Sequence, residues 1–111
     1  MKPIIQFDDF EKLDLRVGKV VSAIMPEWSE KLIEYKVDFG PEIGEKTILS
    51  GIRAWYKPED LIGKSFVFII NLAERQMGKS ISQGMMLMAV EEEKPFLFDV
   101  DKSVKIGTVV R

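Results

Sequence analysis

Residues 13–25 read LDLRVGKVVSAIM, and this stretch decides the fold. Apolar side chains first occupy odd positions, at Leu15 and Val17, and then even positions, at Val20 and Ile24. A β-strand with one buried face keeps a period of two, so the change of parity around Gly18-Lys19 predicts a glycine β-bulge. A bulge bends a strand, and a bent strand can serve both sides of a closed barrel.

The rest of the chain supplies further short strands. They are predicted at residues 31–39, 46–52, 66–70, 85–90, 96–98 and 106–110. Residues 31–39 alternate between apolar and polar side chains, and the turn at 40–44 predicts an antiparallel pair with 46–52. The runs 66–70 and 85–90 are apolar without alternation, so we expect both faces of each to be covered, either inside a barrel or at a subunit interface.

Two short helices complete the pattern. One or two turns are predicted between Phe7 and Leu15, and a second helix begins at Pro58 and ends before Gly63. Many short strands without a long helix predict an all-β protein, best described as an OB-fold. That fold is a five-stranded Greek-key barrel, here with short helices and extra terminal strands. Residues 1–111 are predicted to form a single domain.

Composition narrows the class of protein. The 111 residues are 46% hydrophobic and 31% charged, values typical of a soluble globular domain. The acidic start MKPIIQFDDFEKLD does not resemble a signal peptide, and no apolar run approaches the ~20 residues of a membrane span. The absence of cysteine agrees with a reducing compartment. We therefore expect a cytoplasmic protein that does not contact a membrane.

The absence of histidine argues against an enzyme. It removes the commonest general base and the commonest metal ligand, and without cysteine there is no thiol nucleophile either. The acidic run Glu91-Glu92-Glu93 precedes Lys94-Pro95 and is interpreted as a solvated turn. We expect no catalytic residue, no metal and no cofactor.

Charge is unevenly distributed. The net charge of −2 argues against an indiscriminate nucleic-acid binder. The middle of the chain, residues 46–88, is nevertheless positive, with six basic and three acidic side chains. Composition alone favours an ordinary surface for these six residues, and a nucleic-acid contact is the alternative.

Seven segments occur in the order seen in one protein family. They are Asp14–Val20 (DLRVGKV), Lys31-Leu32, Lys36–Gly40 (KVDFG), Leu49–Ile52 (LSGI), Tyr56–Lys64 (YKPEDLIGK), Asn71-Leu72 and Ser82–Met85 (SQGM). The chain resembles the tRNA-binding domains appended to methionyl-tRNA synthetases, to phenylalanyl-tRNA synthetase β subunits and to EMAP-type cofactors. It is most similar to the free-standing members, which are homodimers, and the CsaA chaperone branch is related to them.

The resemblance implies that RNA lies near the loop from Asn71 to Met85. Asn71, Ser82 and Gln83 would offer hydrogen-bonding groups to RNA. Gly84 would allow close approach of the backbone, and Met85 would lie against a base. Phosphates would meet the basic side chains of Lys31, Arg75 and Lys79.

Some of these residues have structural alternatives. Asn71 and Gly84 are also typical turn residues, and Met85 could belong to the core. An ion pair is the favoured role for Arg16. Trp28, in a polar loop, is the best candidate for stacking on a base, whereas Trp55 is expected in the core. The family loop has Lys-Pro or Arg-Pro where this chain has Ala73-Glu74, which predicts weaker RNA binding.

Two functions follow from the resemblance. The first is structure-selective tRNA binding by a non-catalytic homodimer that acts in trans to aminoacyl-tRNA synthetases, with methionyl-tRNA synthetase as a possible partner. The alternative is a protein-interaction module, either a CsaA-like chaperone or a domain that docks onto a synthetase.

Overall fold

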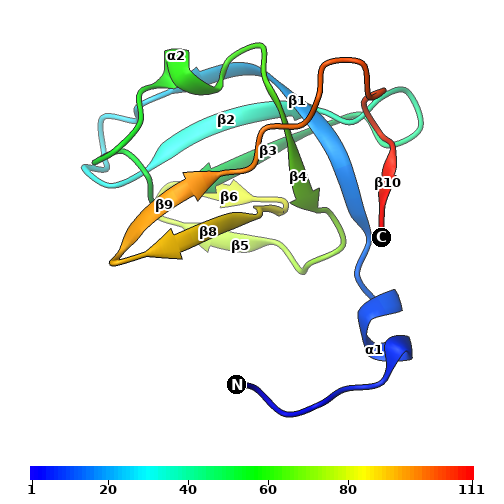
Figure 1. Cartoon of the computed structure of the whole chain (residues 1–111). Coiled ribbons are helices and arrows are strands. Elements are labelled where there is room, and N and C mark those ends of the chain that lie inside the picture. Colours follow the sequence, from blue (N-terminus) through cyan, green and yellow to red (C-terminus); the bar gives the residue numbers. More distant parts are fainter.

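The computed structural model describes residues 1–111 and is built mainly of short antiparallel strands (Figure 1). The strands are β1 (Leu15–Ile24), β2 (Ile33–Asp38), β3 (Glu45–Ser50), β4 (Ser65–Ile69), β5 (Arg75–Met77), β6 (Ser80–Ser82), β7 (Met85–Met86), β8 (Met88–Glu91), β9 (Lys94–Leu97) and β10 (Val109–Val110). The helices are α1 (Phe7–Glu11) and α2 (Pro58–Leu61). The all-β fold class predicted from the sequence is confirmed, and so are both short helices.

One six-stranded sheet forms an almost closed barrel. Its order is β3-β2-β1-β4-β7, with β10 beside the start of β1. Three hydrogen bonds join β3 to residues 82–83, just before β7, and so bring the edges of the sheet together. They run from the Gln83 N–H to the Thr47 carbonyl, from the Thr47 N–H to the Gln83 side chain and from the Leu49 N–H to the Ser82 hydroxyl. The hairpins β5–β6 and β8–β9 are separate two-stranded sheets attached to this barrel.

The barrel encloses one apolar core. Its buried members are Val20, Ile33, Tyr35, Val37, Phe39, Ile48, Ile52, Leu61, Phe66, Phe68 and Met86. The rings of Phe39 and Phe68 meet edge to face, with centroids 5.3 Å apart. The Tyr35 hydroxyl lies 2.6 Å from the Ser50 hydroxyl, and burial raises the pKa of this phenol far above its ordinary value. Tyr35 therefore stays neutral and acts as a core residue.

The bulge in β1 lies at a different place from the one predicted. Gly18 pairs in regular register with Phe66, and the register between β1 and β2 shifts between Val20 and Ser22. Gly18 is needed for space, because a Cβ atom there would lie 2.5 Å from the Phe39 ring. The change from odd to even apolar positions along β1 has another cause. Leu15 and Val17 are buried, but they do not belong to the main core. They lie in the half of β1 to which residues 107–110 bond.

The two apolar runs behave differently. In β4, Phe66, Phe68 and Ile69 are buried, in agreement with the expectation that both faces are covered. In the run 85–90 only Met86 is buried, and Val90 keeps 69% of its surface exposed. The barrel therefore does not cover residues 85–90 on both faces, because part of this run leaves the barrel to form the β8–β9 hairpin. Cover at a subunit interface stays a prediction.

Four smaller features of the chain bear on the sequence predictions. The strand expected at 106–110 is reduced to Val109–Val110, and the β5–β6 hairpin was not predicted. Glu92 and Glu93 form the exposed turn between β8 and β9, as the solvated-turn interpretation expected. Neither helix has the length or the apolar character that crossing a bilayer requires.

Candidate nucleic-acid interface

Two loops meet on one side of the barrel. The first joins β1 to β2 and contains Trp28 and Lys31, and the second joins β4 to β7 and contains the β5–β6 hairpin. The Trp28 ring lies against Gly78 at the tip of this hairpin, because a Cβ atom at Gly78 would overlap the ring. The Ser80 hydroxyl donates a 2.6 Å hydrogen bond to the Glu34 carboxylate at the start of β2. The two loops therefore form one continuous surface.

This surface carries three free basic side chains. Lys31, Arg75 and Lys79 are exposed, and none of them forms an ion pair. The chain has two ion pairs, Lys12 with Asp9 and Arg16 with Asp14, and both lie elsewhere. An exposed, unpaired cation can approach a phosphate without first breaking an internal contact. The three predicted phosphate ligands are thus available, and the structure brings their loops together.

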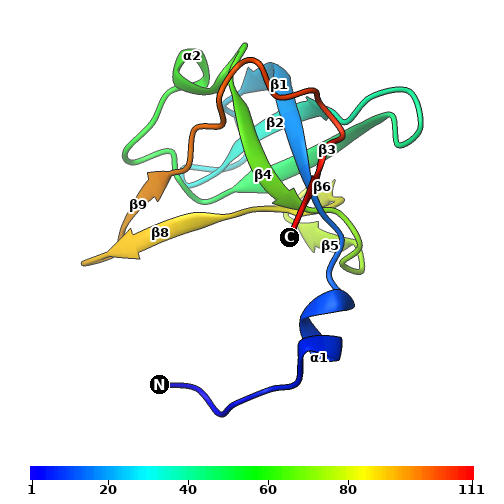
Figure 2. The ribbon, with the colours of Figure 1, turned by 45° about the vertical axis from the view of Figure 1, so that its right-hand side comes forward.

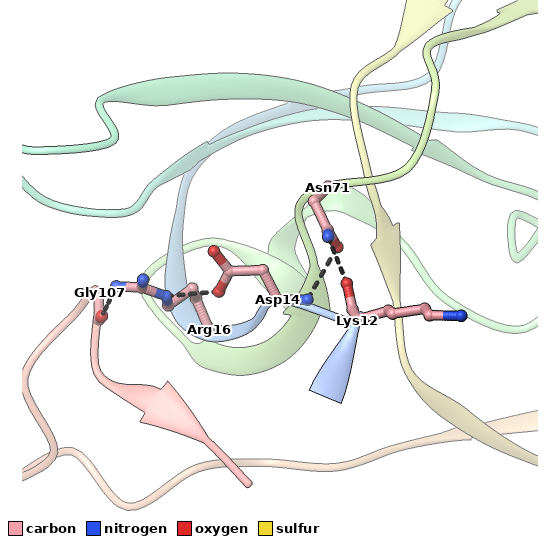
Figure 3. Close-up of polar contacts among 5 residues, drawn as sticks. All are labelled: Lys12, Asp14, Arg16, Asn71 and Gly107. Carbon is pink, nitrogen blue, oxygen red and sulfur yellow. Dashed lines mark hydrogen bonds and ion pairs between the residues drawn. The ribbon is translucent and has the colours of Figure 1, made fainter. Parts of the chain in front are cut away.

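Asn71 joins the end of β4 to the amino-terminal segment (Figure 3). Its Nδ2 atom donates to the Lys12 carbonyl at 2.7 Å, and its Oδ1 atom accepts the Asp14 N–H at 2.8 Å. Arg16 beside it bonds to the Asp14 carboxylate at 2.7 Å and to the Gly107 carbonyl at 3.1 Å. The ion pair favoured for Arg16 is present. Asn71 has a structural role, and its exposed amide keeps one free N–H.

Ser82 is a structural residue, and the prediction that its hydroxyl contacts RNA is corrected here. The side chain is buried, and its hydroxyl accepts the Leu49 N–H and donates to the Gly84 carbonyl, both at 3.1 Å. A buried hydroxyl whose proton is already donated within the chain has no free donor to offer a ligand.

Gln83 is also held by the protein. Its Oε1 atom accepts the Thr47 N–H at 2.9 Å, and its Nε2 atom donates to the Glu74 carboxylate at 3.1 Å. Only the second bond lies at the exposed surface. An RNA acceptor would have to compete with Glu74 for this amide.

Gly84 and Met85 lie at the edge of the barrel. A Cβ atom at Gly84 would lie 2.8 Å from the Ile69 carbonyl, so the close approach that requires glycine here is to β4. Met85 is 46% exposed and is therefore not a core residue. Its side chain lines an apolar groove of about 470 Å³ together with Met77, Met88, Trp55 and Val90.

The two tryptophans differ in their surroundings. Trp28 is half-buried, and part of its ring lies against Gly78. Trp55 is 43% exposed and lines the apolar groove. A tryptophan in a polar loop suggested exposure, but the glycine opposite it lies 50 residues away and gives no local signal.

Arg53 is a further residue that the sequence did not single out. Its guanidinium donates to the carbonyls of Pro26 and Ser29, and its N–H donates to the Lys31 carbonyl at 3.2 Å. This basic residue therefore fixes the β1–β2 loop.

No cluster of three acidic side chains is close enough together to hold a metal ion.

A family profile described as "Putative tRNA binding domain" matches residues 15–109. The chain belongs to this tRNA-binding domain family. A methionine–tRNA ligase of Xylella fastidiosa (strain M12) is 50% identical over 111 residues, which are 98% of this chain and 16% of that enzyme. The tRNA-binding domain thus spans about one sixth of the length of the curated relatives it matches.

Two solved structures have the same fold along their whole length. A MetRS-related protein from Pyrococcus horikoshii has a TM-score of 0.93 and 36% identity, over 99% of this chain and 100% of that one. The chaperone CsaA from Bacillus anthracis has a TM-score of 0.88 and 32% identity, over 98% and 100% of the two chains. The tRNA-binding domain is therefore similar to both kinds of protein considered from the sequence.

Proposed function

We propose that this chain binds tRNA in a structure-selective manner and performs no catalysis. The observation that carries the proposal is the set of three exposed, unpaired cations, Lys31, Arg75 and Lys79, on the loops β1–β2 and β4–β7. These loops correspond to those with which OB-folds bind oligonucleotides. Membership of the tRNA-binding domain family supplies the class of nucleic acid.

The charge distribution supports selectivity for shape. Contacts to phosphates set the register of a protein on RNA but carry no sequence information. A net charge of −2 weakens binding to any nucleic acid whose phosphates do not match the spacing of the three cations. The chain would therefore recognise how a folded tRNA presents its backbone.

We also propose that the chain acts as a homodimer. The amino-terminal arm, residues 1–6, projects away from the barrel in Figures 1 and 2. Ile4 and Phe7 are 87% and 68% exposed, and the β8–β9 region exposes Val90, Phe96 and Phe98. An isologous dimer would cover such surfaces and place two copies of the cationic loops on one particle, which raises avidity for a single tRNA.

The cellular compartment follows from tRNA as the proposed ligand. A non-catalytic tRNA binder would work in the cytoplasm, in trans to aminoacyl-tRNA synthetases. Methionyl-tRNA synthetase is the first candidate partner, because its homologues carry the same domain.

A protein-interaction function is the second candidate, and the apolar groove favours it. Four methionines, Met77, Met85, Met86 and Met88, line this groove beside Trp55. Flexible thioethers adapt to varied apolar partners. This function would be a CsaA-like chaperone activity or docking onto a synthetase.

One competition experiment separates the two functions. The full chain is titrated into labelled total tRNA in a gel-shift assay, with duplex DNA or an unfolded polypeptide as competitor. We expect a complex that neither competitor displaces, with an affinity that falls as salt rises. Displacement by unfolded polypeptide, or no complex at low salt, would favour the chaperone function.

Variants connect this result to the loops. Each of Lys31→Ala, Arg75→Ala and Lys79→Ala should reduce the salt dependence by about one unit of slope. Three exposed lysines elsewhere on the chain, Lys57, Lys64 and Lys102, provide matched control substitutions. Equal losses in both sets would contradict a localised interface.

A further inference from the structure

The β5–β6 hairpin has no main-chain pairing to the barrel. β5 and β6 pair only with each other, through Arg75–Met77 and Ser80–Ser82. Two hydrogen bonds to β3 anchor the carboxyl end of the hairpin, from the Leu49 N–H to the Ser82 hydroxyl and from the Gln83 N–H to the Thr47 carbonyl. Toward its tip, the hairpin contacts the β1–β2 side through the Ser80–Glu34 hydrogen bond and through the Trp28 ring against Gly78.

The contact at Gly78 depends on this residue being glycine. Its φ angle is +62°, in the left-handed region, and the Trp28 ring occupies the space where a Cβ atom would lie. The ring and the turn are therefore complementary in shape. Lys79 directly follows Gly78, so the orientation of the turn decides where this lysine points.

The other side of the contact is fixed in turn. Arg53 donates to the carbonyls of Pro26 and Ser29, on both sides of Trp28. The Ser29 hydroxyl accepts the N–H groups of Lys31 and Leu32, each at 3.2 Å. Trp28 and Lys31 thus belong to one short, internally bonded loop.

We propose that Trp28 is a positioning residue that fixes Lys79 relative to Lys31, so that the two lysines engage neighbouring phosphates of one RNA backbone. This inference rests on the proposed function and deepens it. It replaces stacking of Trp28 on a base with a contact inside the protein. Pre-organised cations lose less conformational freedom on binding, and affinity rises accordingly.

A double-mutant cycle tests the coupling. In the otherwise unchanged chain, we expect Lys79→Ala to weaken tRNA binding about fivefold and to lower the salt slope by about one. In the Trp28→Ala background, the same substitution should weaken tRNA binding less than about twofold, because the position of Lys79 is no longer fixed relative to Lys31. Trp28→Phe keeps a ring over Gly78 and should retain most of the coupling.

Two further variants act as controls. Gly78→Ala should weaken tRNA binding by the same factor as Trp28→Ala. In the Trp28→Ala background, Gly78→Ala should weaken tRNA binding less than it does in the parent chain. Trp55→Ala removes a tryptophan that does not contact Gly78. In this background, Lys79→Ala should weaken tRNA binding by the same factor as in the parent chain. Additive effects of Trp28→Ala and Lys79→Ala would overturn the proposal.

A readout without RNA keeps the inference separate from the proposed function. Trp28→Ala should accelerate amide exchange in the hairpin, residues 75–82, by about threefold or more, while exchange in β2 stays unchanged. Unchanged exchange in the hairpin would overturn the positioning role even if tRNA binds. A second outcome is that amide exchange rises in Trp28→Ala while neither the parent chain nor any variant binds tRNA. In that case the proposed function fails, and so does the assignment of Lys31 and Lys79 to RNA phosphates.

Discussion

Ser82, Gln83 and Asn71 direct their polar atoms mainly toward the protein's own main chain. Ser82 joins Leu49 to Gly84, Gln83 reaches Thr47, and Asn71 holds Lys12 and Asp14. These bonds close the barrel and place the loop that carries Arg75 and Lys79. At the scale of single residues, the polar signature SQGM therefore builds the interface more than it contacts a ligand.

Ser82→Ala tests this structural role. The Leu49 N–H would lose its buried acceptor, so we expect a loss of about 1–2 kcal/mol in the free energy of unfolding. Urea denaturation measures this loss, and Ser22→Ala, at an exposed serine of β1, is the matched control. The folded protein should keep its tRNA affinity. Unchanged stability combined with lost binding would restore Ser82 as a ligand.

Glu74→Gln tests the negative charge beside the cations. The glutamine side chain can still accept the hydrogen bond from Gln83, so the substitution removes charge while keeping the contact. We expect tRNA affinity to rise about two- to fivefold at low salt, and the gain should disappear as salt screens the charge. Filter binding at several salt concentrations measures it.

The control for Glu74→Gln is Glu59→Gln on α2, at the other end of the barrel (Figure 1). It changes the net charge equally. An equal gain in both variants would mean that only net charge matters and that Glu74 has no special position.

The site was predictable from sequence only in part. Lys31, Arg75 and Lys79 were identified through their family pattern, and their exposure agrees with that role. The contact between Trp28 and Gly78 was not predictable, because it joins residues far apart in the chain. Burial of the Ser82 hydroxyl was missed for the same reason, since the N–H that donates to it belongs to Leu49, 33 residues away on β3.

At the scale of the elements, β1 organises the barrel, because it pairs with β2, β4 and β10. Periodicity predicted β2 well, since that strand buries one face only. It misplaced the bulge in β1, because β1 buries residues on both faces along its first half. The β5–β6 hairpin was missed because its sequence, RQMGKSIS, is polar and lacks alternation.

Gly18→Ala tests the packing role of the glycine in β1. A Cβ atom there would lie 2.5 Å from both the Phe39 ring and a Val37 methyl group. We expect the overpacked core to lose about 1–3 kcal/mol of stability in chemical denaturation. Gly51→Ala is the control, because nothing lies within 4 Å of the new methyl group, and its φ is negative. A stability change at Gly18 no larger than at Gly51 would contradict the packing role.

At the scale of the whole molecule, large apolar side chains remain exposed on two parts of the chain. Ile4 and Phe7 belong to the amino-terminal segment, which projects away from the barrel (Figures 1 and 2). Val90, Phe96 and Phe98 belong to the β8–β9 region. Contiguous exposed apolar surface is unusual on a monomer and is typical of an interface. These exposed side chains support the proposed dimer independently of the cationic loops.

Light scattering during gel filtration tests the dimer. We expect a mass of about 25 kDa at micromolar concentration, twice that of the 12.7 kDa chain. Ile4→Asp combined with Phe7→Asp should shift the mass to that of the monomer, because charges would be buried in an apolar interface. Ile62→Asp, at an exposed isoleucine after α2, should leave the dimer intact. A monomer in the unsubstituted chain would rule out the proposed assembly.

The two hydrogen bonds of Asn71 have a consequence for cooperativity. They join the start of the loop that would meet tRNA to the base of the arm that would meet a second chain. Two equilibria that share one junction are thermodynamically linked: if tRNA tightens association of the chains by some factor, association must tighten tRNA binding by the same factor. Near the dimerisation constant, the binding curve for tRNA would then be sigmoidal, and Asn71→Ala would make it hyperbolic.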